Sequence, residues 1–108
     1  LTPMDSTTSL TTLFDSELFQ VFSEPIRLGL LQFLAQNGPN DIGSIAESFP
    51  QDRSVVSRHL QLMERAGIVA SERMARRVVY SIDGAALVSK FEKNLELLKS
   101  LVPDCCGK

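Results

Sequence analysis

The chain has little of what catalysis or a structural metal site usually requires. Its 108 residues include one histidine, His59, and two cysteines. They contain no glycine-rich phosphate loop, no Ser-His-Asp order and no clustered pair of carboxylates, and His59 has no evident nucleophile as a partner. We therefore expect that the protein is not an enzyme and requires no cofactor.

Long apolar runs and a leader peptide are also missing from the sequence. No apolar run approaches the roughly 20 residues that span a bilayer, and no signal peptide precedes the expected fold. We therefore expect a cytoplasmic protein that does not contact a membrane.

Length and composition indicate one small domain. A chain of 108 residues with 44 % apolar residues buries one modest core and shares apolar surface with a partner. We find no internal repeat, linker or second domain. We expect a disordered lead-in at residues 1–9, in which Met4 is the initiator and a cloning remnant precedes it, then a folded domain at residues 10–102 and a tail at residues 103–108.

Residues 51–69 are the most informative stretch, and they predict an amphipathic helix that Asp52 caps and Gly67 ends. At 100° per residue, one side of this helix is apolar and carries Val56, His59, Leu60 and Met63. The other side carries short hydroxyls, an amide and a guanidinium, namely Ser54, Ser57, Arg58 and Gln61, and Arg53 at the start of the helix is a further DNA-binding candidate. Such a helix packs on a small core and offers donors to base edges and phosphates, so we predict a DNA-recognition helix. The alternative is an ordinary amphipathic surface helix.

Two β-rich runs follow within Ile68–Ile82, and they predict a hairpin. Arg73, Arg76 and Arg77 lie at its expected tip, so the hairpin is a basic finger that reaches for phosphate or the minor groove. A recognition helix followed by a basic hairpin is the order of a winged helix-turn-helix.

The segments before residue 51 complete this unit. Pro25 begins a helix with the apolar stripe Ile26, Leu30, Phe33 and Leu34, and the stripe runs to Asn37-Gly38-Pro39. Asp41 caps a short helix that carries Ile42, Ile45, Ala46 and Phe49 and stops at Pro50. We therefore predict a mainly α fold with a small β-hairpin, of the winged helix-turn-helix type.

The charge distribution agrees with a DNA-binding surface although the net charge is −2. Residues 51–80 carry six arginines against three acidic residues, which gives +3 and leaves −5 for the rest of the chain. A basic surface on an acidic body attracts phosphate locally and limits nonspecific binding. The alternative is a solvated surface with scattered arginines. A winged helix that binds another protein rather than DNA is a further alternative, but the outer arginines argue against it.

Several motifs resemble one known family. Residues 18–34, LFQVFSEPIRLGLLQFL, resemble the Leu-Phe-x-Ala-Leu-Ser-Asp-Pro-x-Arg-Leu-x-Ile-Leu signature of the ArsR-type (ArsR/SmtB) bacterial repressors. Residues 55–60, VVSRHL, resemble their recognition-helix core, and residues 66–69, AGIV, resemble the exit from it. The resemblance spans about residues 13–102. It implies a dimeric winged-helix transcriptional repressor that a metal, a metalloid or another stress signal releases from DNA.

The two ends of the domain carry apolar stripes that have no place in a three-helix core. Leu10, Phe14, Leu18 and Val21 form a stripe in the first helix. The last helix, expected from about Gly84 to Leu101, carries Leu87, Phe91, Leu95, Leu98 and Val102. In the family that the chain resembles, the first and last helices pair across a two-fold axis. We therefore expect a homodimer whose recognition helices lie roughly 34–36 Å apart on a palindromic operator in double-stranded DNA.

The sequence departs from the family at the wing. A glycine usually occupies the wing tip of these proteins, whereas this chain has Ala75. Alanine tolerates a positive φ poorly, so we expect a wing that is longer or more mobile than a two-residue primed turn allows.

The residues at the positions of the family's better-known metal sites differ in this chain. Some relatives carry a Cys-x-Cys pair in the helix-turn-helix, where this chain has Ile42-Gly-Ser44, and others bind zinc, nickel or cobalt through Asp and His of the last helix. The last helix here has acidic residues (Asp83, Glu92 and Glu96) but no histidine. We expect His59 to be a packed, hydrogen-bonded residue, so a four-coordinate zinc site is difficult to assemble.

Cys105 and Cys106 are then the remaining candidate ligands. In a cytosolic protein, such a pair favours a soft-metal or redox site over a structural bridge, because a disulfide between neighbours strains the intervening peptide. Some arsenic sensors of the ArsR type also carry vicinal cysteines near the end of the last helix. We predict that Cys105 and Cys106 bind trivalent arsenic, with an organoarsenical such as methylarsenite favoured over arsenite. The alternatives are another soft metal, thiol-redox sensing and an incidental pair.

Overall fold

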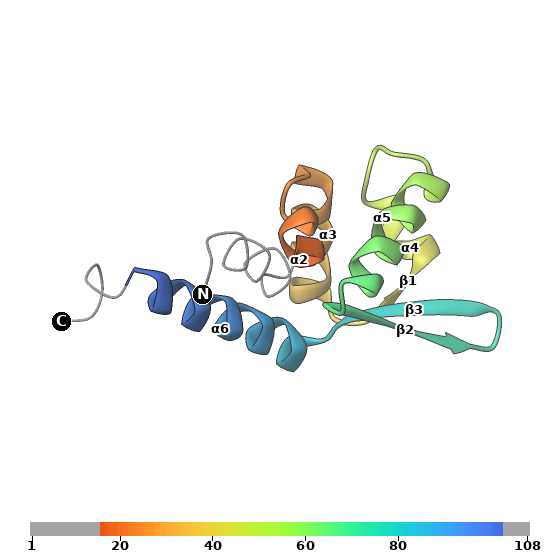
Figure 1. Cartoon of the computed structure of the whole chain (residues 1–108). Helices are drawn as coiled ribbons and strands as arrows, with labels where there is room; N and C mark the ends of the chain where they lie inside the picture. The colour runs from red at the N-terminus through yellow and green to blue at the C-terminus, as the bar shows by residue number, and fades with distance from the viewer. Residues whose placement is uncertain (1–15, 103–108) are drawn as a thin grey trace.

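The computed structural model describes residues 16–102, which form helices around a small sheet. In chain order, these elements are α2 (Ser16–Val21), α3 (Pro25–Asn37), β1 (Asn40–Asp41), α4 (Ile42–Glu47), α5 (Arg53–Arg65), β2 (Val69–Met74), β3 (Arg77–Ile82) and α6 (Gly84–Leu101). Figure 1 shows α2–α5 gathered in one cluster, with the β2–β3 hairpin pointing to one side and α6 to the other. The prediction of a mainly helical fold with a small antiparallel sheet is confirmed.

The helix boundaries follow the signals in the sequence. Pro25 begins α3, and Gly38, at φ 75°, ends it by donating its N–H to the Leu34 carbonyl at 2.8 Å. The Asp41 side chain caps α4 by accepting hydrogen bonds from the N–H groups of Gly43 and Ser44.

The helix α4 is shorter than predicted. It ends at Glu47 rather than at Pro50, because the N–H groups of Ser48 and Phe49 bond to carbonyls only three residues back, at 3.0 and 3.2 Å. This tighter turn leaves Phe49 outside the helix, where its ring still packs on Phe33 with the centroids 6.1 Å apart.

One apolar core holds the helices against the sheet. Its buried members come from α2, α3, α4, α5, β2, β3 and the turn after α5, and they are Leu18, Val21, Leu30, Leu34, Ile42, Ile45, Val56, Leu60, Met63, Ala66, Ile68, Val69 and Tyr80. The predicted apolar side of α5 therefore faces the core, with Val56, Leu60 and Met63 fully buried. Leu10 and Phe14, which we placed in the first apolar stripe, lie outside the described residues.

The sheet has a third strand that the sequence did not reveal. Strand order is β1-β3-β2, all antiparallel, and β1 pairs Asn40 with Tyr80 and Asp41 with Val79. Two polar residues carry no alternation from which a strand could be predicted. Asp41 thus belongs to β1 and caps α4, so one residue ties the helix-turn-helix to the hairpin.

The prediction of a longer wing loop is wrong. The β2–β3 register runs out to the pair Met74–Arg77, which leaves only Ala75 and Arg76 in the turn. Ala75 adopts φ 58°, a left-handed conformation that costs an alanine about 1–2 kcal/mol. Six residue pairs between the strands outweigh this local cost and fix the short turn.

Replacing Ala75 by glycine is expected to stabilise the fold by about 1 kcal/mol, since glycine adopts a positive φ without a steric penalty. Urea unfolding followed by circular dichroism measures the change. Ala70→Gly is the matched control on β2, at an exposed position, and is expected to destabilise the fold because it loosens a regular strand. A loss of stability in Ala75→Gly would contradict this account of the turn.

Candidate nucleic-acid interface

Both ends of α5 are well defined, which gives the helix a fixed direction on the core. Asp52 occupies the N-cap position, as predicted, but its side chain makes no capping hydrogen bond. At the other end Gly67 adopts φ 84°, as predicted, and donates its N–H to Glu64 O at 2.9 Å, while the Ile68 N–H bonds to Met63 O at 3.2 Å. These two bonds form a Schellman motif, which turns the chain directly into β2.

The outer side of α5 carries the polar residues that the sequence predicted. Arg53, Ser54, Arg58 and Gln61 are exposed, and Ser57 is half-buried. The Gln61 amide donates a hydrogen bond to the Ser57 hydroxyl oxygen at 3.2 Å, so these two side chains are already oriented as a pair. This side offers hydroxyl, amide and guanidinium groups to a base edge or a phosphate.

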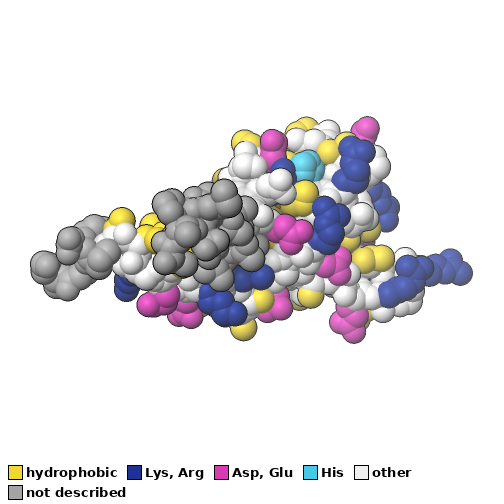
Figure 2. Space-filling model, in the orientation of Figure 1, with side chains coloured by type: hydrophobic (Ala, Val, Ile, Leu, Met, Phe, Trp, Pro, Cys, Tyr) yellow, Lys and Arg dark blue, Asp and Glu magenta, His cyan; other side chains and the backbone are white. Residues whose placement is uncertain are grey.

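The wing extends this polar surface. Arg73, Arg76 and Arg77 are all exposed around the β2–β3 turn. Figure 2 shows Lys and Arg side chains at the tip of the hairpin and over the helix-turn-helix part of the same face. Seven of the eight residues that we predicted to bind DNA are thus exposed and Ser57 is half-buried, and their contacts with DNA stay a prediction.

Sequence reasoning missed two side-chain hydrogen bonds, of which one ties the wing to α5 and the other lies at the start of α4. The Ser71 hydroxyl on β2 donates to the Glu64 carboxylate on α5 at 2.7 Å. The hydroxyl of Ser44 donates to Asp41 at 2.7 Å, and this hydrogen bond, ahead of the charge of Arg77, lowers the pKa of Asp41. No sequence signal marks the Ser71–Glu64 pair, because it depends on the angle between α5 and β2.

His59 lies half-buried on α5, as expected for a packed residue. Its pKa is lowered by desolvation and then by the positive charges of Arg27 and Arg58, while Glu24 acts in the opposite direction. Within residues 16–102 no three side chains of the types His, Cys, Asp and Glu lie close enough together to hold a metal ion. Cys105 and Cys106, our predicted arsenic ligands, lie outside the described residues.

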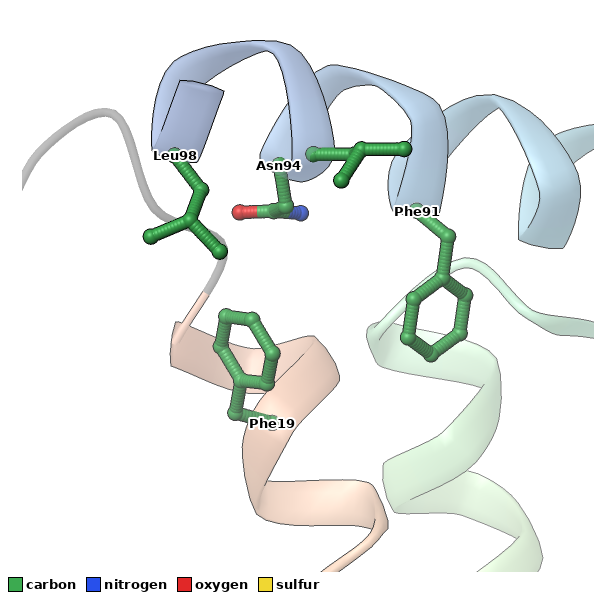
Figure 3. Close-up of a pocket in the computed structure, with 5 residues that line it drawn as sticks. Phe19, Phe91, Asn94 and Leu98 are labelled. Carbon is green, nitrogen blue, oxygen red and sulfur yellow. The ribbon is translucent and has the colours of Figure 1, made fainter. Parts of the chain in front are cut away.

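A second surface lies on α6 and is strongly apolar. Only Asn94 is buried in this helix, whereas Val88, Phe91, Leu95, Leu98 and Leu101 each expose more than 40 % of their area. Phe19 of α2 faces Phe91, Asn94 and Leu98 across a shallow pocket of about 210 Å³ (Figure 3). An apolar patch of this extent usually marks an interface.

In the described part of the chain, no helix is long and apolar enough to cross a membrane.

The known proteins that this chain resembles are transcriptional regulators. The model of the family "bacterial regulatory protein, arsR family" matches residues 24–71, from the start of α3 into β2. The crystal structure of a possible transcriptional regulator for arsenical resistance is 32 % identical, with a TM-score of 0.62, and the match covers 82 % of this chain and 95 % of that one. The chain belongs to the ArsR family.

Two further proteins show how far along the chain the likeness extends. An uncharacterised helix-turn-helix transcriptional regulator of Methanocaldococcus jannaschii is 33 % identical over 54 % of this chain, which spans 65 % of the length of that relative. The solution structure of a homodimeric winged helix-turn-helix DNA-binding domain from Mycobacterium bovis is 25 % identical, with a TM-score of 0.65. That match covers 93 % of this chain and 86 % of the other.

Proposed function

We propose that this ArsR-family chain is a homodimeric transcriptional repressor that binds a palindromic operator in double-stranded DNA. The observation that carries the proposal is the outer side of α5, where Ser54, Arg58 and Gln61 are exposed beside an arginine-rich wing. A helix in the major groove reads base edges through such side chains, and a basic hairpin holds the adjacent backbone. Buried core residues fix the inner side of the same helix, so the polar side points outward from a rigid support.

We infer the dimer from the exposed apolar surface of α6 and α2. Phe19, Phe91, Leu95 and Leu98 leave between 43 % and 50 % of their areas exposed, which is costly in water unless a partner covers them. The homodimeric relative from Mycobacterium bovis supports a second copy of the chain as that partner. A two-fold dimer presents two copies of α5 and therefore calls for a palindromic site.

The test of the proposed function is operator binding by the full chain. Fluorescence anisotropy with the DNA upstream of the protein's own gene is expected to give tight binding, at two chains per site, that unlabelled random DNA competes for poorly. Equal affinity for the upstream DNA and for random DNA of the same length would contradict a sequence-specific repressor.

Removing a wing arginine is expected to weaken specific and nonspecific DNA binding together. For Arg76→Ala or Arg77→Ala, the slope of log affinity against log salt should fall by about one, because one phosphate contact releases about one counterion. Binding titrations at several salt concentrations measure the slope. Lys99→Ala removes an exposed cation from α6 instead and should leave the slope unchanged. Equal slopes in all three variants and the wild type would exclude the wing from the interface.

The effector is the second part of the proposal. We propose that a trivalent arsenical binds Cys105 and Cys106 and releases the repressor from DNA, with organoarsenicals favoured over arsenite. Thiolates bind thiophilic centres, and one relative at 32 % identity is described as a possible regulator for arsenical resistance. The two cysteines follow α6 after a few residues, so binding there acts on the dimer surface and shifts the two recognition helices relative to successive grooves.

A further inference from the structure

One charge in the core has no counterpart among the described residues. Arg27, in the first turn of α3, is only 8 % exposed, and its Nε and Nη1 atoms are buried without a hydrogen-bond partner. An arginine does not lose its proton in a protein, so the guanidinium remains cationic. A buried cation without an anion is strongly unfavourable, and a natural sequence keeps such a group mainly where function requires it.

The surroundings of Arg27 place this cation at the edge of the recognition helix. The charge of Arg27 acts on His59 of α5, and so do the charges of Arg58 and Glu24. Arg58 is exposed on the predicted DNA-binding side, directly before His59 in the chain. His59 reaches the surface beside cationic and acidic side chains, as the cyan histidine in Figure 2 shows. The helices α3 and α5 are in contact, so Arg27 at the start of α3 and Arg58 in the first half of α5 both contribute positive charge around His59.

The ligand that this chemistry recognises is an oxyanion. Nε and Nη1 are buried and have no hydrogen-bond partner, so a ligand from the surface reaches the guanidinium only through the small part of Arg27 that stays exposed. Charge-assisted hydrogen bonds to phosphate are among the strongest that arginine makes. Glu24, which is exposed and makes no side-chain capping bond to α3, is the one acidic group among those that act on His59, and it repels such a ligand.

We propose that Arg27 and His59 form a phosphate-binding site beside the recognition helix, which a backbone phosphate of the operator occupies. The inference rests on the proposed DNA binding, because a duplex held against the outer side of α5 brings a row of phosphates along each edge of its major groove. Arg27 is then a positioning contact that fixes how α5 enters the groove and reads no base itself.

The proposal predicts opposite changes in stability and in DNA binding for Arg27→Met. Methionine fills the buried site without a charge, so the melting temperature of the free protein should stay equal or rise. Operator affinity should fall about tenfold, the effect of one charge-assisted hydrogen bond, and the salt slope should fall by about one. The loss should be the same for operator and random DNA. Arg65→Met, which removes an exposed arginine from the last turn of α5, is the matched control and should change the slope less.

A second variant keeps the test independent of core packing. Glu24→Gln changes an exposed side chain that makes no capping hydrogen bond, so the fold should be unaffected, and DNA affinity should rise severalfold. Glu92→Gln on α6 is its control, with no change expected. A lower melting temperature and an unchanged salt slope in Arg27→Met, or unchanged DNA binding in Glu24→Gln, would overturn the proposal and assign Arg27 a structural role.

An experiment with inorganic phosphate distinguishes a site for a DNA backbone phosphate from a site for a small free anion. Thermal unfolding of the wild type in phosphate, matched for ionic strength with chloride, should show little stabilisation, because the operator supplies many contacts at once. Stabilisation by phosphate that Arg27→Met removes, together with an unchanged operator slope, would overturn the DNA-backbone assignment in favour of a free-anion site. Failure of the wild type to bind its operator at all would contradict the proposed function instead.

Discussion

Replacing either Cys105 or Cys106 by serine is expected to leave operator affinity at the wild-type value and to abolish release of the DNA by a trivalent arsenical. Affinity should persist because neither cysteine belongs to the surface formed by α5 and the wing. Release should disappear in both variants because one thiolate alone cannot chelate the arsenic. Anisotropy of the bound operator during titration with phenylarsine oxide measures both quantities. Release of either serine variant at wild-type concentrations would exclude the cysteine pair as the sensor.

The same titration compares effectors. Inorganic trivalent arsenic has three exchangeable positions, whereas a methyl or aryl arsenical has one position blocked by carbon, so two thiolates complete its coordination. The chain has only two cysteines, so organoarsenicals should release the DNA at lower concentrations than arsenite or antimonite. Equal potency of arsenite, with a three-sulfur shell in X-ray absorption, would indicate a site shared between subunits. Release by diamide that a reductant reverses would favour thiol-redox sensing.

Arg58→Ala is expected to cost about 1–3 kcal/mol of operator binding, which is roughly a 5- to 150-fold loss of affinity. Arg58 is exposed in the first half of α5, between the Ser54 hydroxyl and the Gln61 amide. A guanidinium there can bond to a guanine edge in two places, so its removal should also relax the sequence preference. Competition between operator variants measures that preference.

The matched control for this variant is Arg65→Ala, at the opposite end of the same helix. It removes an equal charge from an exposed position. Any difference in operator affinity between the two variants is then due to the position of the arginine and not to the net charge. Unchanged operator affinity in Arg58→Ala would remove the outer side of α5 from the proposed base-reading surface.

The sequence was sufficient to predict those features that depend on local signals. The proline at position 25, the carboxylate of Asp41 and the glycine at position 67 act through the backbone of their own helix, and each occupies the predicted position. The apolar side of α5 follows from spacing alone, and Val56, Leu60 and Met63 are buried as predicted. The same spacing placed the polar candidates of α5 on the outside.

The features that sequence reasoning missed depend on contacts between distant segments. The strand β1 exists because β3 offers its free edge to Asn40 and Asp41, not because of any preference of those two residues. The strained turn at Ala75 is imposed by the pairing of two strands, which overrides the preference of one residue. The burial of Arg27 depends on how α3 lies against α5, so its position in an amphipathic helix gave no warning of a buried charge.

The helix α6 has a consequence for how the folded state depends on protein concentration. Only Asn94 of its 18 residues is buried, and apart from contacts such as those of Leu87 and Phe91 this helix leaves most of its apolar area for a partner to cover. Association and folding are then linked by mass action, so the melting temperature should rise as the protein is concentrated. In a cell, a scarce repressor of this design would lose both its partner and the order of its last helix, which couples the abundance of the protein to its structural integrity.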